Sequence, residues 1–459
     1  MLHEASDTIA AISTPPGEGG IGIVRLSGPE AHAIALAMFR SSTGRDPRAG
    51  RQRIFHGHAL DLAGVVVDEV LLHLMHAPHT YTREDIAEIN GHGGAAVLNA
   101  LLEECLRRGA RLARPGEFTL RAFLNGRIDL VQAEAVIDQI HGRTRAALQA
   151  ANAAASGVLS RQLFEIKDEL VFALSRLEAA VDFPEDDLPE MVDPVWHARV
   201  QSALAGMRAL LDTADAGRIL REGAAVVIAG RPNAGKSSLF NALLRDNRAI
   251  VSAQPGTTRD RIEEYVQVGG VPVKLIDTAG LREAQDEVER IGVDLARGAF
   301  KAANAALYVL DAAAGVAPED ETHVLELSAL EIPVIAVLNK ADLVPDAAPP
   351  PWAAACRAVH AVSALTGQGM DTLEATLAAL LLGGHAVDAA QPLLNRVHQK
   401  DSLRRAMECV ERLLTDTALS PEFLALELQE ALAALGEITG ETTPDDLLGQ
   451  IFDNFCIGK

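Results

Sequence analysis

Cysteine is scarce in this sequence, and long apolar runs are absent from it. The four cysteines, Cys105, Cys356, Cys409 and Cys456, are far apart and form no C-x-x-C pair. This spacing excludes a disulfide framework and a cysteine-based zinc site, and we expect reduced thiols. No run approaches the roughly 18 to 20 apolar residues of a membrane span, and the first residues lack the pattern of a signal peptide. We therefore expect a cytoplasmic protein.

Positive charge is also in short supply. The 459 residues include 41 Lys and Arg against 63 Asp and Glu, a formal net charge of −22. A surface that coats nucleic acid needs clustered basic side chains, so this balance argues against that class of protein. The deficit falls after residue 126, since residues 1–126 hold 12 basic and 14 acidic side chains while residues 386–459 hold 6 and 13. A small basic site, or a partner that supplies the basic surface, is still allowed.

Four segments differ in pattern. Residues 1–126 alternate strand-like apolar runs with Pro- and Gly-containing turns, which is typical of a small α+β domain. Residues 127–222 are rich in Ala and Leu at helical spacing, and residues 386–459 show a helical pattern again. Between them, residues 223–385 alternate short apolar strands with helices, as a doubly wound α/β sheet does. We predict a multidomain α/β protein whose helical domain is split in sequence by an inserted α/β domain.

A phosphate-binding loop is predicted at residues 230–237. Gly-Arg-Pro-Asn-Ala-Gly-Lys-Ser fits G-x-x-x-x-G-K-[ST] and lies between an apolar strand and a helix. Glycines let backbone N–H groups surround the phosphates, Lys236 reaches the β and γ phosphates, and Ser237 can ligate Mg²⁺. The alternative, a chance glycine-rich turn, fits this strand-loop-helix context poorly.

Further elements follow in the order that a GTPase requires. Residues 277–280, Asp-Thr-Ala-Gly, end an apolar strand where a carboxylate can hold Mg²⁺ through water. Residues 339–342, Asn-Lys-Ala-Asp, end another, and Asp342 can accept hydrogen bonds from guanine that adenine cannot donate. Residues 363–365, Ser-Ala-Leu, are placed to complete the base pocket. Together these elements predict GTP binding.

The segment around residues 255–260 is predicted to be the first switch loop. Its sequence is Pro-Gly-Thr-Thr-Arg-Asp, and a threonine there can ligate Mg²⁺ only while the γ phosphate is present. Many signalling GTPases orient the attacking water with a Gln directly after the D-x-x-G motif, but Leu281 occupies that position here. Another group must therefore orient the water.

The sequence resembles the tRNA modification GTPases of the MnmE (TrmE) family, within the Era- and Der-type GTPases. The switch loop and the D-x-x-G segment carry the wider resemblance. The narrower one rests on segments outside the α/β domain, namely residues 14–25 (TPPGEGGIGIVR), 91–94 (GHGG), 114–118 (RPGEF), 121–125 (RAFLN) and 455–459 (FCIGK). The resemblance covers essentially the whole chain.

This resemblance implies a homodimer built through a tetrahydrofolate-binding N-terminal domain, and a second, FAD-containing partner (MnmG or GidA). Together they add an aminomethyl or carboxymethylaminomethyl group at C5 of the tRNA wobble uridine, using 5,10-methylenetetrahydrofolate as donor; 5-formyltetrahydrofolate is expected to fit the same site. By position, Arg25, Glu88, Arg127 and Lys459 would bind folate. Related sequences can have Lys where this chain has Arg127, which keeps the charge but changes the geometry.

The resemblance also assigns the ions and the water-orienting group. Asn233, Ser252, Gln254 and Thr257 would hold K⁺, Ser237 and Thr258 would hold Mg²⁺, and Glu289 would position the attacking water. The full set of expected GTP-binding residues is Asn233, Ala234, Gly235, Lys236, Ser237, Ser238, Ser252, Ala253, Gln254, Pro255, Gly256, Thr257, Thr258, Asp277, Thr278, Ala279, Gly280, Asn339, Lys340, Ala341, Asp342, Ser363, Ala364 and Leu365.

Two alternatives stay open. The first is a ribosome-assembly or regulatory GTPase that binds RNA without modifying it, although the acidic residues 386–459 do not resemble an appended basic RNA-binding module. The second alternative is a zinc site, because eight of the 14 histidines precede residue 93. No H-x-x-x-H pair lies on a convincing helix, however. We interpret these histidines as ordinary surface or core residues.

Overall fold

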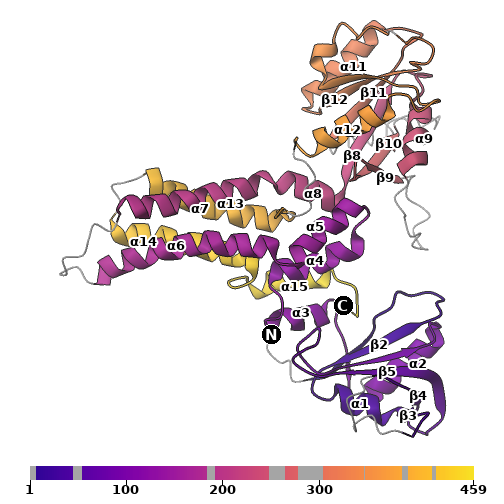
Figure 1. Ribbon diagram of the computed structural model, residues 1–459, viewed down its shortest axis with the longest axis vertical. Coiled ribbons are helices and arrows are strands. Elements are labelled where there is room, and N and C mark those ends of the chain that lie inside the picture. Colours follow the sequence, from indigo (N-terminus) through magenta and orange to yellow (C-terminus); the bar gives the residue numbers. More distant parts are fainter. Residues whose placement is uncertain are drawn as a thin grey trace, which may run out of the picture. The chain divides into compact units, whose positions relative to one another are not determined.

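The computed structural model describes residues 7–44, 54–182, 192–247, 264–277, 303–345, 347–384, 391–415 and 420–458. Two compact units emerge from the contacts between residues: residues 1–137 with 433–459, and residues 138–432. They group the elements differently from the four segments predicted from the sequence, whose boundaries stay predictions. The expected multidomain α/β fold is confirmed, since sheets, helices and a helical bundle alternate along the chain (Figure 1). Among the described residues, no helix is both long and apolar enough to cross a membrane.

The first unit contains a seven-stranded sheet in the order β3-β4-β5-β6-β2-β1-β7. Its strands are β1 (Ile9–Ile12), β2 (Gly22–Ser27), β3 (Phe39–Ser41), β4 (Ile54–Leu60), β5 (Val66–Met75), β6 (Ile86–Gly91) and β7 (Arg111–Leu112). Its helices are α1 (Ala31–Ala37), α2 (Ala95–Arg107), α3 (Glu117–Leu124), α4 (Leu130–His141, which runs past the unit boundary) and α15 (Asp445–Asp453).

Strand alternation gives this sheet two different faces. On β1, Ala10 joins the core that α1 and α2 form, whereas Ile9 and Ala11 pack against Phe118 of α3. A third cluster joins α4 to α15 through Leu130, Leu448 and neighbouring side chains. Because side chains of a strand point alternately to opposite faces, the short apolar run of β1 serves both cores. The end of the chain thereby belongs to the same unit as its beginning.

The second unit contains a six-stranded sheet in the order β13-β12-β11-β8-β10-β9. Its strands are β8 (Ala224–Gly230), β9 (Glu264–Val268), β10 (Val271–Asp277), β11 (Ala305–Asp311), β12 (Val334–Asn339) and β13 (Ala358–Ala361), of which only β9 is antiparallel to its neighbour. Helices α9 (Lys236–Asn247) and α12 (Met370–Leu381) share one core with the sheet. Helix α11 (Pro318–Ala329) packs in the core on the other face, and a short 3-10 helix spans Ala353–Ala355.

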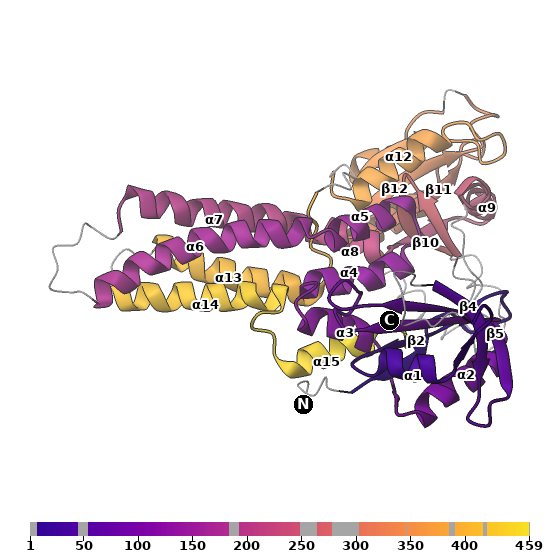
Figure 2. The same ribbon diagram turned by 60° about the horizontal axis from the view of Figure 1, so that its bottom comes forward.

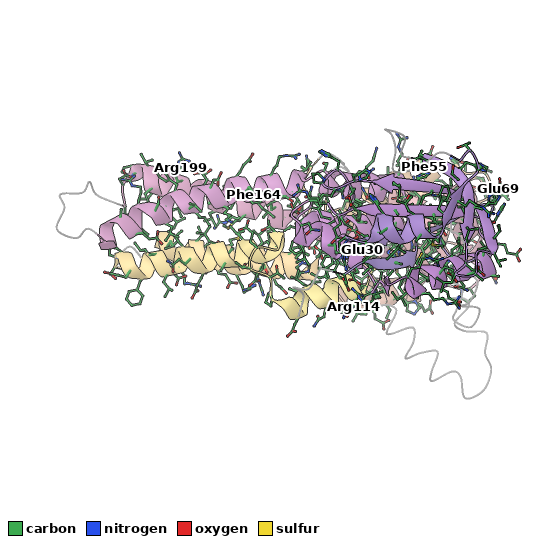
Figure 3. The ribbon with its side chains drawn as sticks, turned by 90° about the horizontal axis from the view of Figure 1, so that it is seen from below. Glu30, Phe55, Glu69, Arg114, Phe164 and Arg199 are labelled. Carbon is green, nitrogen blue, oxygen red and sulfur yellow. The ribbon has the colours of Figure 1, made fainter. Side chains whose placement is uncertain are left out.

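Long helices make up the rest of the second unit (Figure 2). They are α5 (Arg145–Ala155), α6 (Val158–Asp182), α7 (Pro194–Asp212), α8 (Ala214–Glu222), α13 (Val397–Thr415) and α14 (Pro421–Thr439, which continues past residue 432). Leu159, Leu163, Leu170 and Leu177 of α6 are buried, in agreement with the helical spacing of the leucines. An ion pair of 3.0 Å between Arg199 and Glu169 joins α7 to α6, and Figure 3 labels Arg199 with Phe164 of α6.

Candidate functional site

The predicted nucleotide-binding segments gather at one edge of the six-stranded sheet. Strands β8, β10, β11, β12 and β13 are parallel, so their carboxyl ends meet there. The phosphate-binding loop follows β8, Asp277 ends β10, Asn339 ends β12, and residues 363–365 follow β13. Ligands of doubly wound sheets bind at this edge, which is where each motif was predicted to act.

The phosphate-binding loop is folded around Lys236. This side chain is 9% exposed, and its ammonium donates hydrogen bonds to the carbonyl oxygens of Gly230 at 3.0 Å and Arg231 at 2.8 Å. Ser237 and Ser238 lie exposed in the first turn of α9, where a hydroxyl can reach a metal ion or phosphate. Phosphate oxygens would offer Lys236 stronger, charge-assisted acceptors than these carbonyls.

Asn339 joins the phosphate-binding loop to the base-pocket loop. Its amide nitrogen lies 3.1 Å from the carbonyl oxygen of Ala234, and its amide oxygen accepts a 3.1 Å hydrogen bond from the backbone N–H of Ala364. A Cβ on Gly235, whose φ is +92°, would lie 2.1 Å from the Asn339 amide nitrogen. Only glycine fits at that position, because any side chain would collide with the amide that holds the two loops together.

Lys340 adds a second link between these loops. Its ammonium forms a 2.6 Å ion pair with Asp311, at the end of β11, and lies 3.3 Å from the carbonyl oxygen of Asn233. Asn233 and Lys340 both have positive φ, 61° and 65°. The hydrogen bond with Lys340 holds the pKa of Asp311 below its usual value. Sequence reasoning missed Asp311, although an acidic residue at the end of an apolar strand matches the placement of Asp277.

Arg231 anchors the outer side of the phosphate-binding loop and was also missed. Its guanidinium lies 3.1 Å from Asp320 of α11 and donates a 2.7 Å hydrogen bond to the carbonyl oxygen of Gly315. Asp320 is fully buried and also accepts a 3.0 Å hydrogen bond from the Tyr308 hydroxyl. Burial, and then the Asp320 carboxylate, raise the pKa of Tyr308. No sequence motif links residues so far apart.

Several predicted site residues lie outside the described part of the chain. They are Ser252, Ala253, Gln254, Pro255, Gly256, Thr257 and Thr258 of the switch loop, with Thr278, Ala279, Gly280, Glu289 and Lys459. Asp277 is described in its backbone, paired with Ile228. Ala341 is buried, Asp342 is exposed, Ser363 is buried and the Leu365 side chain is 86% exposed.

A second group of predicted residues meets in the first unit. Strands β2 and β6 are antiparallel neighbours, and their register places Arg25 directly opposite Glu88. The Nε and Nη2 atoms of Arg25 both lie 2.8 Å from Oε1 of Glu88. Among the described residues, the other carboxylate oxygen, Oε2, has no hydrogen-bond partner. This leaves an acceptor that Arg25 holds in place, and two aromatic rings lie near Arg25 and Arg127.

Those rings are Tyr81 and Phe118. The guanidinium carbon of Arg127 lies 4.7 Å from the centre of the Tyr81 ring, and that of Arg25 lies 5.7 Å from the centre of the Phe118 ring. The Tyr81 hydroxyl and Thr119 Oγ1 are 2.9 Å apart. Burial raises the pKa of Tyr81, while Thr119 and the charges of Arg127 and Arg25 oppose the rise. Arg25 and Arg127, two of the residues expected to bind folate, thus lie over aromatic rings that sequence reasoning did not single out, and Arg25 joins them to Glu88.

The C-terminal segment reaches the same place. The carbonyl oxygen of Gly458 accepts hydrogen bonds from Ser13 Oγ at 3.0 Å and from Arg25 Nη1 at 3.4 Å. Gly458 has a φ of +96°, and a Cβ there would lie 2.5 Å from the carbonyl oxygen of Ile12. This close approach requires glycine, so the sequence around residue 458 is fitted to the end of β1.

The sheet order, the phosphate-binding loop and the linked base-pocket loop define a GTPase domain, joined in one chain to an α+β domain and a set of long helices. Comparisons with known proteins narrow this class. The family model "MnmE helical domain" matches residues 130–456, and the model "GTP-binding protein TrmE N-terminus" matches residues 8–127.

Similar proteins extend over the whole chain. The tRNA modification GTPase MnmE of Chloroflexus aurantiacus is 50% identical over 461 residues, with 99% of this chain and 100% of that protein covered. Those of Roseiflexus sp. and Geobacter sulfurreducens are each 47% identical, with at least 99% of both chains covered. The chain belongs to the MnmE family of tRNA modification GTPases.

Proposed function

We propose that this GTPase acts in tRNA modification by a K⁺-dependent cycle, together with an FAD-containing partner. The pair would add a carboxymethylaminomethyl or aminomethyl group at C5 of the wobble uridine, with a tetrahydrofolate one-carbon donor. The observation that carries the proposal is that one chain holds both a GTPase loop system and the separate Arg25, Glu88 and Arg127 cluster. A GTPase that only switches would have no need of the second cluster.

For GTP hydrolysis, the roles follow from charge and position. Lys236 binds the β and γ phosphates, Ser237 and Thr258 hold Mg²⁺, and Glu289 orients the attacking water in place of the Gln that Leu281 replaces. Asn233, Ser252, Gln254 and Thr257 hold K⁺ beside the phosphates, where its charge stabilises the transition state. Asn233 supports the proposed K⁺ site, because its side chain is exposed and its backbone carbonyl oxygen lies 3.3 Å from the Lys340 ammonium.

For folate binding, the Arg25–Glu88 pair supplies the specificity. A pterin ring presents an amide-like edge of donors, and the free Oε2 atom of Glu88 can accept from it while Arg25 holds the carboxylate in place. The positive charges of Arg127 and Lys459 suit the carboxylates of the glutamate tail. Tyr81 and Phe118 offer flat apolar surfaces to the ring system.

GTP turnover measured in K⁺ and in Na⁺ tests the proposed mechanism of hydrolysis. Replacing K⁺ by Na⁺ is expected to reduce GTP hydrolysis sharply, because only K⁺ fits the proposed site. Glu289→Ala is expected to leave nucleotide binding intact and to remove hydrolysis. Equal turnover in the two salts, or weakened binding with unchanged turnover in the variant, would count against these roles.

Analysis of tRNA nucleosides tests the proposed role in wobble-uridine modification. Mass spectrometry of tRNA from cells that lack this chain should show wobble uridines without the C5 group, and wild-type chain but not a Glu88→Gln variant should restore it. Unaltered wobble uridines would instead favour a role in ribosome assembly. We also propose a homodimer formed through the N-terminal domain, for which sedimentation of the purified chain is the direct measurement.

A further inference from the structure

Three side chains from separate elements meet at one end of the β5–β6 pair in the first unit. Met75 and Ile86 are paired residues at the ends of these strands, so His76 and Asp85 directly follow and precede the pair. His32 comes from α1. One potential ligand atom from each of His32, His76 and Asp85 lies within 4.8 Å of the others. The two imidazole rings are 4.6 Å apart, nearly perpendicular to each other at 81°.

Hydrogen bonding determines which nitrogen of the neutral His32 ring carries the hydrogen. Its Nε2 atom lies 3.0 Å from the carbonyl oxygen of Met75 and 3.1 Å from that of Ile86. Both partners can only accept, so Nε2 must carry the hydrogen. In the neutral ring, the lone pair is therefore on Nδ1, the nitrogen nearer to Asp85. Histidine ligands of metal ions are oriented in this way, with the other ring N–H donating to a backbone carbonyl.

The carboxylate does not form hydrogen bonds with these rings. Asp85 lies 3.7 Å from Nδ1 of His32 and 4.0 Å from Nδ1 of His76. Elsewhere in the same unit, a histidine and a carboxylate that pair directly approach to 2.7 Å, as His92 and Asp68 do. Asp85 instead accepts a 2.9 Å hydrogen bond from the backbone N–H of Ala77 at Oδ1, and its Oδ2 is the oxygen nearer to His32. Three potential metal ligands thus lie close together without hydrogen bonds between their side chains.

The spacing suits a small transition-metal ion. In a tetrahedral zinc site with bonds of about 2.0 to 2.1 Å, neighbouring ligand atoms lie roughly 3.4 Å apart. The 3.7 Å from His32 to Oδ2 of Asp85 and the 4.0 Å from His76 to Oδ1 exceed this value by about 0.3 and 0.6 Å. One ligand atom from each of the three residues lies within 4.8 Å of the other two. Side-chain exposure is 15% for His32, 35% for Asp85 and 61% for His76. His32 is held by two backbone carbonyls and Asp85 by one backbone N–H, so the exposed His76 is the ligand that can move inward and contract the site around an ion.

We propose that His32, His76 and Asp85 bind a divalent transition-metal ion, with Zn²⁺ the best match to two imidazoles and a carboxylate and with water as the fourth ligand. For His32 and His76, the proposal is an alternative to the interpretation of the histidines as ordinary residues. It is independent of the GTPase cycle and of folate binding, because none of the three residues belongs to either candidate site. The competing explanation is a simple electrostatic cluster that binds no metal.

Titration of the full-length, chelator-treated chain decides between them. Isothermal titration with Zn²⁺ should show one equivalent whose affinity falls roughly ten-fold or more in His76→Asn and in Asp85→Asn. His79→Asn is the matched control, since His79 is exposed in the same loop. Identical titrations of the wild type, His76→Asn and Asp85→Asn would overturn the proposal.

Co²⁺ distinguishes this site from a cysteine site. Bound Co²⁺ should give the visible absorption of a tetrahedral ion, without the near-ultraviolet charge-transfer band that a thiolate such as Cys456 would add. Zn²⁺ should displace it and should raise the unfolding temperature of the wild type and of His79→Asn, but not of His76→Asn. A thiolate band, or a thermal shift that persists in His76→Asn, would place the metal elsewhere and refute the proposal.

Discussion

The two candidate sites of this protein are built in opposite ways. The nucleotide site uses short contiguous segments, each at the carboxyl end of a parallel strand, so residues that act together are mostly neighbours in sequence. The Arg25 cluster draws on β2, β6, the turn after α3 and the C-terminal segment, and joins residues as far apart as Arg25 and Gly458. A loop that binds through its backbone can be encoded locally, whereas a cluster of side chains depends on strand register and on the docking of a chain end.

The comparison predicts different sensitivities for the two sites. A change inside the phosphate-binding loop should affect that site alone. A change in how the C-terminal segment docks should affect the Arg25 cluster without reaching the loops of the second unit. Three experiments test this difference between the two sites, in decreasing order of the change that we expect.

Lys236→Ala should reduce GTP turnover by roughly 10²-fold or more, because no other residue of the loop places a positive charge on the β and γ phosphates. Tetrahydrofolate binding, measured on the same preparation by calorimetry, should be unchanged. Lys274→Ala, at a lysine of β10 away from the loops, is the control and should retain turnover. Loss of folate binding in Lys236→Ala would show that the two sites are not separate.

Gly458→Ala should weaken tetrahydrofolate binding and lower the free energy of unfolding by about 1 to 3 kcal/mol, because its backbone has positive φ and its Cβ would strike the carbonyl of Ile12. GTP turnover should not change. Gly449→Ala is the matched control: a Cβ there meets nothing within 4 Å, and alanine favours helix α15. Equal effects of the two substitutions would contradict the docking of the C-terminal segment.

Acid should destabilise the first unit through Asp7 and Glu117. Burial raises the pKa of each carboxyl, but hydrogen bonds and charges from Arg111 and Arg121 outweigh it and hold both pKa values below the usual range. Because the folded pKa lies below the unfolded one, the stabilisation is complete above the unfolded value of about 4 and is lost as the pH falls through the folded value. The urea concentration at the midpoint of unfolding should therefore fall as the pH is lowered below about 4.

Arg111→Gln removes one partner of both carboxyls and is the variant for this experiment. Its unfolding midpoint should be lower at neutral pH and should fall less steeply in acid than that of the wild type. A wild-type midpoint that is constant from pH 7 to pH 3 would exclude this contribution.

Much of the nucleotide site could be predicted because its chemistry is carried by local sequence. The loop at residues 230–237 is recognisable from its glycines, its lysine and the strand before it, and Asn339 from the apolar strand that it ends. The sequence did not predict Asp311, Arg231 or Asp320, because the packing of β11 and α11 sets their partners. In the first unit, Arg25, Glu88 and Arg127 came from a family resemblance, and no periodicity or spacing pointed to Tyr81 or Phe118.

The sequence alone predicts a guanine-nucleotide site and its position, because consecutive residues of a strand, loop and helix create that surface from their own backbone. Tertiary contacts, by contrast, place Arg25 opposite Glu88 and Gly458 against the end of β1, and they bring ligand atoms of His32, His76 and Asp85 within 4.8 Å of one another. Those encounters depend on strand register and on helix packing, which follow from the burial of apolar side chains distributed over the whole domain.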